Sequence, residues 1–214
     1  MTYSLNEIDV MGKRAARGAG LTWGLAEEAG KAARWLCACD LPGAEILNEI
    51  LTISDGKKYD DLAPISAEGV WHAPSGSLSP LFAGPALSDR AASLAAGHEI
   101  ELGKTIKPLF LAPYLSTAAK LTGTTIELAW ADATVTVTSQ GILLKGGNVS
   151  ATEAESVRCR GVEANQEISS EGVHGRNVDR DAWDHLSLLM HRYLAPDTEE
   201  SRIAGAGAGL NDND

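Results

Sequence analysis

Two segments of alternating apolar and polar residues, 125–130 and 133–138, are separated only by Ala131 and Asp132. Side chains of a β-strand alternate between two faces, so this period of two predicts two strands that each bury one face. A connection of two residues can join antiparallel neighbours, whereas parallel neighbours need a much longer crossover. The pattern therefore predicts an antiparallel hairpin within residues 124–145 and argues against a parallel dinucleotide-binding sheet.

Three further segments have the composition of short strands: residues 98–102, 142–144 and 156–160. In the last of these, Arg158 and Arg160 would share one face, because strand residues two apart point the same way. A short helix is expected over residues 113–121, ending at Gly123. The short connections predict an antiparallel meander.

The first 53 residues carry apolar side chains at helical spacing and predict three helices. Ser4 and Glu7 form the pattern of a capping box at the first helix, and Gly18 ends that helix. Thr22 and Asp40 are the expected N-caps of the second and third helices. A last helix is expected over residues 181–194.

Residues 54–87 are rich in Pro, Gly and Ser and are expected to be mostly irregular, followed by a short helix over residues 89–96 that Ser88 caps. The fold class is therefore α+β, with an N-terminal helical layer packed with a mostly antiparallel sheet and a C-terminal helix. We expect a single domain over residues 1–214, made of four segments. These are helices (1–53), a loop with a short helix (54–97), strands (98–175), and a helix with a Gly-rich tail (176–214).

Charge and composition limit the function. The formal net charge is −11 and the isoelectric point is about 4.9, which argues against binding to nucleic acid or to an anionic membrane surface. No apolar run approaches the roughly 18 residues that a membrane span needs. The chain shows no basic segment followed by an apolar one at its start, and its three cysteines cannot form a closed disulfide framework. We therefore expect a cytoplasmic protein.

Charged residues concentrate on the first two predicted helices. Glu28 lies beside Trp35 and, if half-buried, could hold its proton near neutral pH and act as a catalytic acid or base. Arg17, Glu27 and Arg34 are the candidate groups for binding a polar or anionic ligand. The same residues also fit an ordinary solvated helix face stabilised by pairs with Lys31, and the sequence leaves both interpretations open.

Two histidines are further catalytic candidates because imidazole titrates near neutral pH. His72 lies in the long loop, and His98 begins a predicted strand, on the face away from Glu99 and Glu101. No spacing predicts a metal site, and the sequence identifies no cofactor.

The C-terminal residues 205–214 combine a Gly-Ala run with acidic residues. We expect this tail to pack near Arg14, Arg17 and Arg34, and to bring Arg202 and Asp212 to a ligand. Leu188 stands alone on the polar face of the last helix, and it predicts a homodimer.

Two stretches of the chain, residues 13–31 and 198–214, carry a resemblance. The chain is similar to an uncharacterised bacterial domain-of-unknown-function family that is frequent in marine proteobacteria. The resemblance implies that both ends of the chain hold the family's pattern. It brings no known reaction and no catalytic residue.

Two hypotheses about function follow. In the first, the chain is a small cytoplasmic metabolic protein, and an enzyme if a carboxylate acts as acid and base on a bound polar or anionic ligand. In the second, it is a non-catalytic assembly subunit whose C-terminal tail docks on a partner chain.

Overall fold

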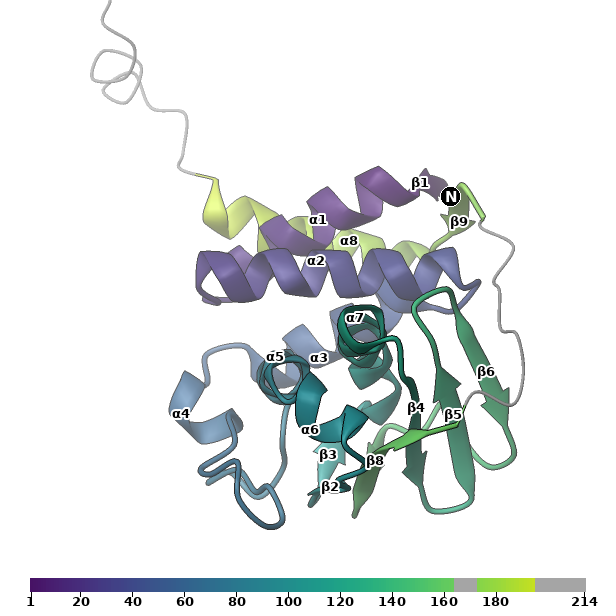
Figure 1. Ribbon diagram of the computed structural model, residues 1–214. Coiled ribbons are helices and arrows are strands. Elements are labelled where there is room, and N and C mark those ends of the chain that lie inside the picture. The colour runs from purple at the N-terminus through teal and green to yellow at the C-terminus, as the bar shows by residue number, and fades with distance from the viewer. Residues whose placement is uncertain (164–172, 195–214) are drawn as a thin grey trace, which may run out of the picture.

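The computed structural model describes residues 1–163 and 173–194 (Figure 1). The helices are α1 (Leu5–Gly18), α2 (Trp23–Ala38), α3 (Gly43–Ser54), α4 (Tyr59–Leu62), α5 (Pro80–Asp89), α6 (Ala91–Ala95), the 3-10 helix η1 (Pro108–Leu111), α7 (Ala112–Thr122) and α8 (Arg180–Tyr193). The strands are β1 (Thr2–Ser4), β2 (Ile100–Leu102), β3 (Thr105–Ile106), β4 (Thr125–Trp130), β5 (Ala133–Val137), β6 (Ile142–Lys145), β7 (Glu153–Ala154), β8 (Val157–Val162) and β9 (Gly175–Asn177). The predicted α+β class, with a helical layer, an antiparallel sheet and a C-terminal helix, is confirmed. No helix within the described ranges is long and apolar enough to cross a membrane.

The main sheet has five strands in the order β2-β8-β4-β5-β6, and every neighbouring pair is antiparallel. The predicted hairpin is confirmed, with Leu128 opposite Val135. The simple meander is wrong in one respect, because β8 inserts between β2 and β4 instead of following β6. Its Cys159 lies opposite both Ile100 and Leu128. A strand alternates in the same way at an edge and in the middle of a sheet, so its sequence could not show this position.

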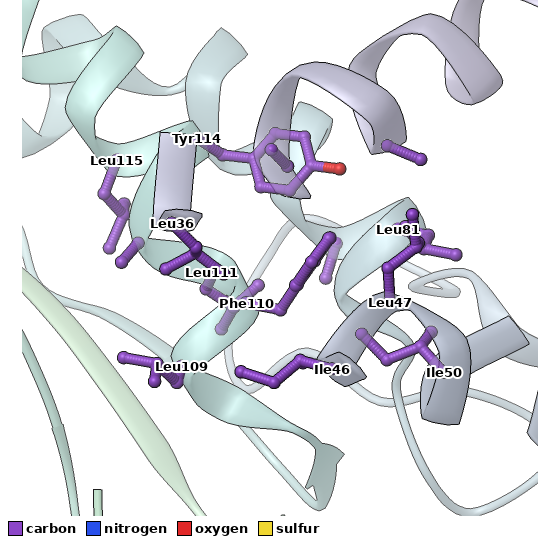
Figure 2. Packing of buried hydrophobic residues seen from close by; sticks show 14 of the residues in the cluster. Leu36, Ile46, Leu47, Ile50, Leu81, Leu109, Phe110, Leu111, Tyr114 and Leu115 are labelled. Carbon is purple, nitrogen blue, oxygen red and sulfur yellow. The ribbon is translucent and has the colours of Figure 1, made fainter. Parts of the chain in front are cut away.

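The helices form two tiers, and α7 lies beside β4 of the sheet (Figure 1). The upper tier contains α1, α2 and α8, and the lower tier contains α3, α5 and α7. Figure 2 shows Phe110 and Leu111 of η1 and Tyr114 of α7 packed with Leu36 of α2 and Leu47 of α3. These side chains are at most 3% exposed and belong to the main hydrophobic cluster, which also includes sheet residues. The single-domain prediction agrees with this shared core but stays a prediction.

The N-caps predicted from the sequence are present at only some of the helices. The capping box of α1 is present: the Glu7 amide donates to Ser4 Oγ at 3.2 Å, and the Ser4 amide donates to Glu7 Oε2 at 2.8 Å. The Ser4 amide and, second, the Ser4 hydroxyl donate to the Glu7 carboxylate, and these two bonds lower the pKa of Glu7. Thr22 precedes α2, but its side chain makes no capping bond. The predicted Asp40 cap is wrong, because Asp40 has a left-handed φ of 59° and Pro42 is the residue before α3.

The prediction for residues 54–96 needs correction. The irregular stretch contains the single turn α4, and α5 begins at Pro80, within the part expected to be irregular. Proline fits the first turn of a helix, since the amide there has no intrahelical partner. Ser88 lies inside α5, where its hydroxyl donates to the Tyr114 carbonyl, and it caps no helix. The predicted helix over 89–96 is only α6, and the strand predicted from His98 begins at Ile100.

The upper tier depends on close approach of helix backbones. A Cβ atom added at Gly30 of α2 would lie 2.5 Å from the Asp9 carbonyl oxygen of α1, and one at Gly12 would lie 3.2 Å from the Gly30 Cα. One at Gly18 would overlap the Leu189 carbonyl of α8. Glycine therefore sets the spacing between α1 and both of its neighbours.

This spacing gives a test with an internal control in the same helix. Gly30→Ala should lower the free energy of unfolding by about 2 kcal/mol, because the methyl group forces α1 and α2 apart. Gly24→Ala should be neutral or raise it by up to about 1 kcal/mol, since a Cβ there meets nothing within 4 Å. Urea denaturation measures both. Equal effects of the two variants would contradict the close-contact interpretation.

Candidate functional site

The charged residues of α1 and α2 pair mostly with one another. Lys13 Nζ lies 2.8 Å from Glu27 Oε1, and Lys31 Nζ lies 2.8 Å from Glu28 Oε1. Arg34 is 3.9 Å from Asp9. The pair with Lys13 lowers the pKa of Glu27. This arrangement has the geometry of a solvated helix face.

Glu28 nevertheless lines a small hollow of about 120 Å³, together with Lys31, Trp35 and Tyr114. The Glu28 side chain is 42% exposed. The Tyr114 hydroxyl is buried with no partner in the part of the chain that the structure describes, and burial, together with the charge of Glu28, raises its pKa. The hollow is too small for more than a few ligand atoms.

Arg17 turns toward the protein. It donates a hydrogen bond to the Leu21 carbonyl, and its guanidinium lies 5.0 Å from the Trp23 ring and 5.6 Å from the Tyr193 ring. Cations are attracted to the faces of aromatic rings at such distances. Arg17 therefore joins the turn between α1 and α2 to the end of α8.

The other candidates lie elsewhere. His72 packs on Gly103, where an added Cβ would be 2.5 Å from its Nδ1, and His98 Nδ1 is 3.2 Å from Ser93 Oγ. Both histidines lie near β2: His98 precedes it by two residues, and His72 follows Trp71, which pairs with Leu102 of β2. Arg202, Asp212 and the tail prediction fall outside the described residues. The structure thus divides the candidates between the helical layer and the surroundings of β2.

A concave surface lies at the sheet, and we call it the acidic hollow. Its volume is about 820 Å³. Five carboxylate side chains line it, from β2, the turn between β4 and β5, and the segment around β7: Glu99, Glu101, Asp132, Glu153 and Glu155. Arg158 of β8 is the one cationic residue that lines it in the part of the chain that the structure describes. A second hollow of about 340 Å³ shares Glu99 and Glu101 with it.

The sheet and its turns position these acids. Glu101 lies opposite Arg158 in the register of β2 and β8, and Ser156 Oγ donates to Glu101 Oε1 at 3.4 Å. Lys104 Nζ lies 2.8 Å from Glu153 and 3.5 Å from Glu155. The hydrogen bond and charge of Glu153 are the largest causes that raise the pKa of Lys104.

The acids of the hollow come from separate segments of the chain. Among residues 1–163 and 173–194, no three His, Cys, Asp or Glu side chains lie in a group that could hold a metal ion. The acids are therefore spread around the hollow. The sequence pattern placed Glu99 and Glu101 on a strand but did not predict that these acids line one hollow, because β8 reaches β2, and β7 reaches β3, only through long-range strand pairing.

Comparison with known proteins adds a family match. Residues 3–79 match the model of a family described as "Protein of unknown function (DUF3726)". This confirms the resemblance to a domain of unknown function over those residues, which include α1, α2, α3 and α4. The association with marine proteobacteria stays a prediction. No curated protein matches the chain.

Two of the three cysteines have the properties of packing residues. Cys37 and Cys159 are fully buried, and desolvation raises the pKa of both thiols. A raised pKa keeps the thiol neutral, and the thiolate is the nucleophilic form. Cys39 is only partly buried.

Cysteine labelling tests this difference. Under native conditions at pH 8, Ellman's reagent should label Cys39 alone, and Cys39→Ser should remove the fast reaction. All three thiols should react in denaturant. Because the folded-state pKa values are raised, stability should also fall as pH rises above about 8.5, where unfolded thiols ionise. Rapid native labelling of Cys159 in the Cys39→Ser variant would contradict its placement.

Proposed function

We propose that the chain binds a small organic cation, such as a diamine or polyamine, in the acidic hollow. The observation that carries the proposal is the set of five carboxylates around one concave surface, with Arg158 as the single cation among the described residues that line it. The volume of about 820 Å³ lies in the range of small-molecule sites. The proposal keeps the predicted polar ligand and assigns it a positive charge.

The arrangement of the acids supports a ligand with separated charges. Glu101 lies on β2, Asp132 lies in the turn after β4, and Glu153 lies on β7. A flexible diamine can reach two such groups at once, whereas a single compact ion cannot. Lys104 already forms ion pairs with Glu153 and Glu155. We therefore assign Glu99, Glu101 and Asp132 as the main contacts of the ligand.

We propose that the acidic hollow binds a ligand, and we assign it no catalytic reaction. Glu28 lines a different hollow, and Glu27 and Arg34 would have to leave Lys13 and Asp9 to bind a ligand. Catalytic roles for Glu28, His72 and His98 stay predictions, as does the cytoplasmic location. His98 directly precedes Glu99, which lines the proposed site, and His72 directly follows Trp71, which lines the second hollow.

The alternative of an assembly subunit has one observation in its favour. Leu188 on the outer face of α8 is 63% exposed, whereas Leu186 and Leu189 of the same helix are buried.

A homodimer through this face would bury Leu188. Light scattering at micromolar concentration should then report twice the chain mass of 22.5 kDa, and Leu188→Gln should return the mass to that of one chain. A wild-type protein that scatters as a single chain would contradict the dimer.

Diamine binding tests the proposed function directly. Isothermal titration of the full chain should detect 1,4-diaminobutane and not its neutral analogue 1,4-butanediol. The double variant Glu99→Gln, Glu101→Gln should weaken diamine binding about tenfold, since each exposed ion pair contributes up to about 1 kcal/mol. Binding should also weaken as salt is raised.

The control is Asp184→Asn, which also removes an acid, from an exposed pair with Arg180 on α8. It should leave diamine binding unchanged. The proposal fails if diamine and diol bind alike, if neither binds, or if the control variant weakens binding as much as the double variant does.

A further inference from the structure

A second pocket lies on the helical side of the molecule, where the turn between α1 and α2 meets the end of α3, α4 and α5. We call it the α2 pocket, and its volume is about 220 Å³. Its walls are largely apolar, and Leu25, Leu62 and Phe82 line it with Tyr59. Leu62 and Phe82 belong to a hydrophobic cluster separate from the main core. The rings of Tyr59 and Phe82 meet edge to face, with centroids 4.9 Å apart.

The charges around the α2 pocket are opposite to those of the acidic hollow. Among residues 1–163 and 173–194, no Asp or Glu lines it, although the whole chain has a net charge of −11. Lys57 lines it and forms no ion pair with any residue in the described ranges. Asp55, two residues before, is occupied by Arg192 through bonds of 2.9 and 2.7 Å. Among the described residues, this wall therefore has the Lys57 ammonium group and no carboxylate in its lining.

The start of α2 adds a second favourable feature for an anion. Thr22 lines the pocket, but its side chain does not cap the helix, and the first turn contains no acidic residue. The first amides of a helix have no intrahelical acceptor, and they carry partial positive charge. Anions bind at such ends in many proteins. This end has 16 residues of helix behind it.

Ser54 supplies an independent sign of a missing ligand group. It is the last residue of α3, it lines the pocket, and it is only 4% exposed. Its Oγ is buried and has no hydrogen-bond partner among the described residues. A buried hydroxyl without a partner is costly, so such groups in native proteins call for an explanation.

We infer that the α2 pocket binds a small aromatic carboxylic acid in its ionised form. The ring packs against Leu25, Tyr59 and Phe82, and the carboxylate meets Lys57, the first turn of α2 and the Ser54 hydroxyl. The aromatic walls favour a planar apolar body, and the absence of acidic residues from the described lining permits the negative charge. This site shares no residue with the acidic hollow, so the inference stands or falls independently of the proposed function.

Benzoate and benzamide are the probes, because they have nearly the same size and differ in charge. Binding to the full chain is measured by isothermal titration and by ligand-observed NMR. We expect benzoate to bind at least tenfold more tightly than benzamide. Equal affinities, or no binding of either compound, would overturn the inference.

Two variants separate ligand contacts from folding. Ser54→Ala removes a hydroxyl that has no protein partner, so the melting temperature should stay the same or rise, while benzoate affinity should fall about tenfold. Lys57→Met should weaken benzoate binding and leave benzamide binding unchanged. Lys58→Met, which changes the neighbouring lysine outside the lining, is the matched control and should bind like the wild type.

Other results would count against the site. If Ser54→Ala binds benzoate as tightly as the wild type, the buried hydroxyl is not a ligand group and the inference is wrong. If Lys58→Met weakens benzoate as much as Lys57→Met, the effect is one of overall charge and not of this pocket, and the inference is again wrong.

Discussion

The backbones of α1 and α2 touch at Gly12 and Gly30, and much of the remaining architecture follows from that contact. A Cβ at Gly30 would lie within 2.5 Å of the Asp9 carbonyl, so only glycine permits the helices to lie this close. Gly18 brings α8 equally near to α1. The side chains around these contacts are small, with Ala15, Ala26, Ala29 and Ala33 fully buried. Tight packing of small side chains gives many close atomic contacts although each residue buries little area.

The close contact of α1 and α2 also fixes the position of the turn that joins them. The turn from α1 to α2 is held by the bond from Arg17 to the Leu21 carbonyl, and the same guanidinium lies against Trp23 and Tyr193. The ligand-binding role of Arg17 stays a prediction, and its contacts connect three helices. Through this turn it sets the position of Thr22, and therefore of one wall of the α2 pocket. An indirect effect on ligand binding is consistent with that geometry.

Local patterns allowed much of the fold to be predicted. The hairpin from Thr125 to Val137 follows from period-two alternation and a two-residue connection, and the α1 cap follows from Ser4 and Glu7. The position of β8 could not be predicted, because Val157 and Cys159 show the same alternation wherever the strand pairs. The N-cap prediction for Asp40 was wrong because aspartate is common both at N-caps and in left-handed turns. In the structure Asp40 lies in a left-handed turn. The acids of the hollow were visible as residues but not as a group, since only the pairing of β8 with β2 brings Ser156 to Glu101.

The acidic hollow and the α2 pocket differ in the sign of their charge because lysine and arginine side chains pair with the acids of the helical layer and of the sheet to different extents. In the helical layer Lys13, Lys31 and Arg192 each lie within 3 Å of an acid. Each of these three acids therefore has a cation beside it. At the sheet, Lys104 serves both Glu153 and Glu155, and Arg158 faces Glu101 across the strands. More acids than cations remain around the hollow, and a concave surface of one charge concentrates ions of the opposite charge. A chain with a net charge of −11 can therefore present an anionic site at its sheet and keep a separate pocket that no described acid lines beside the uncapped start of α2.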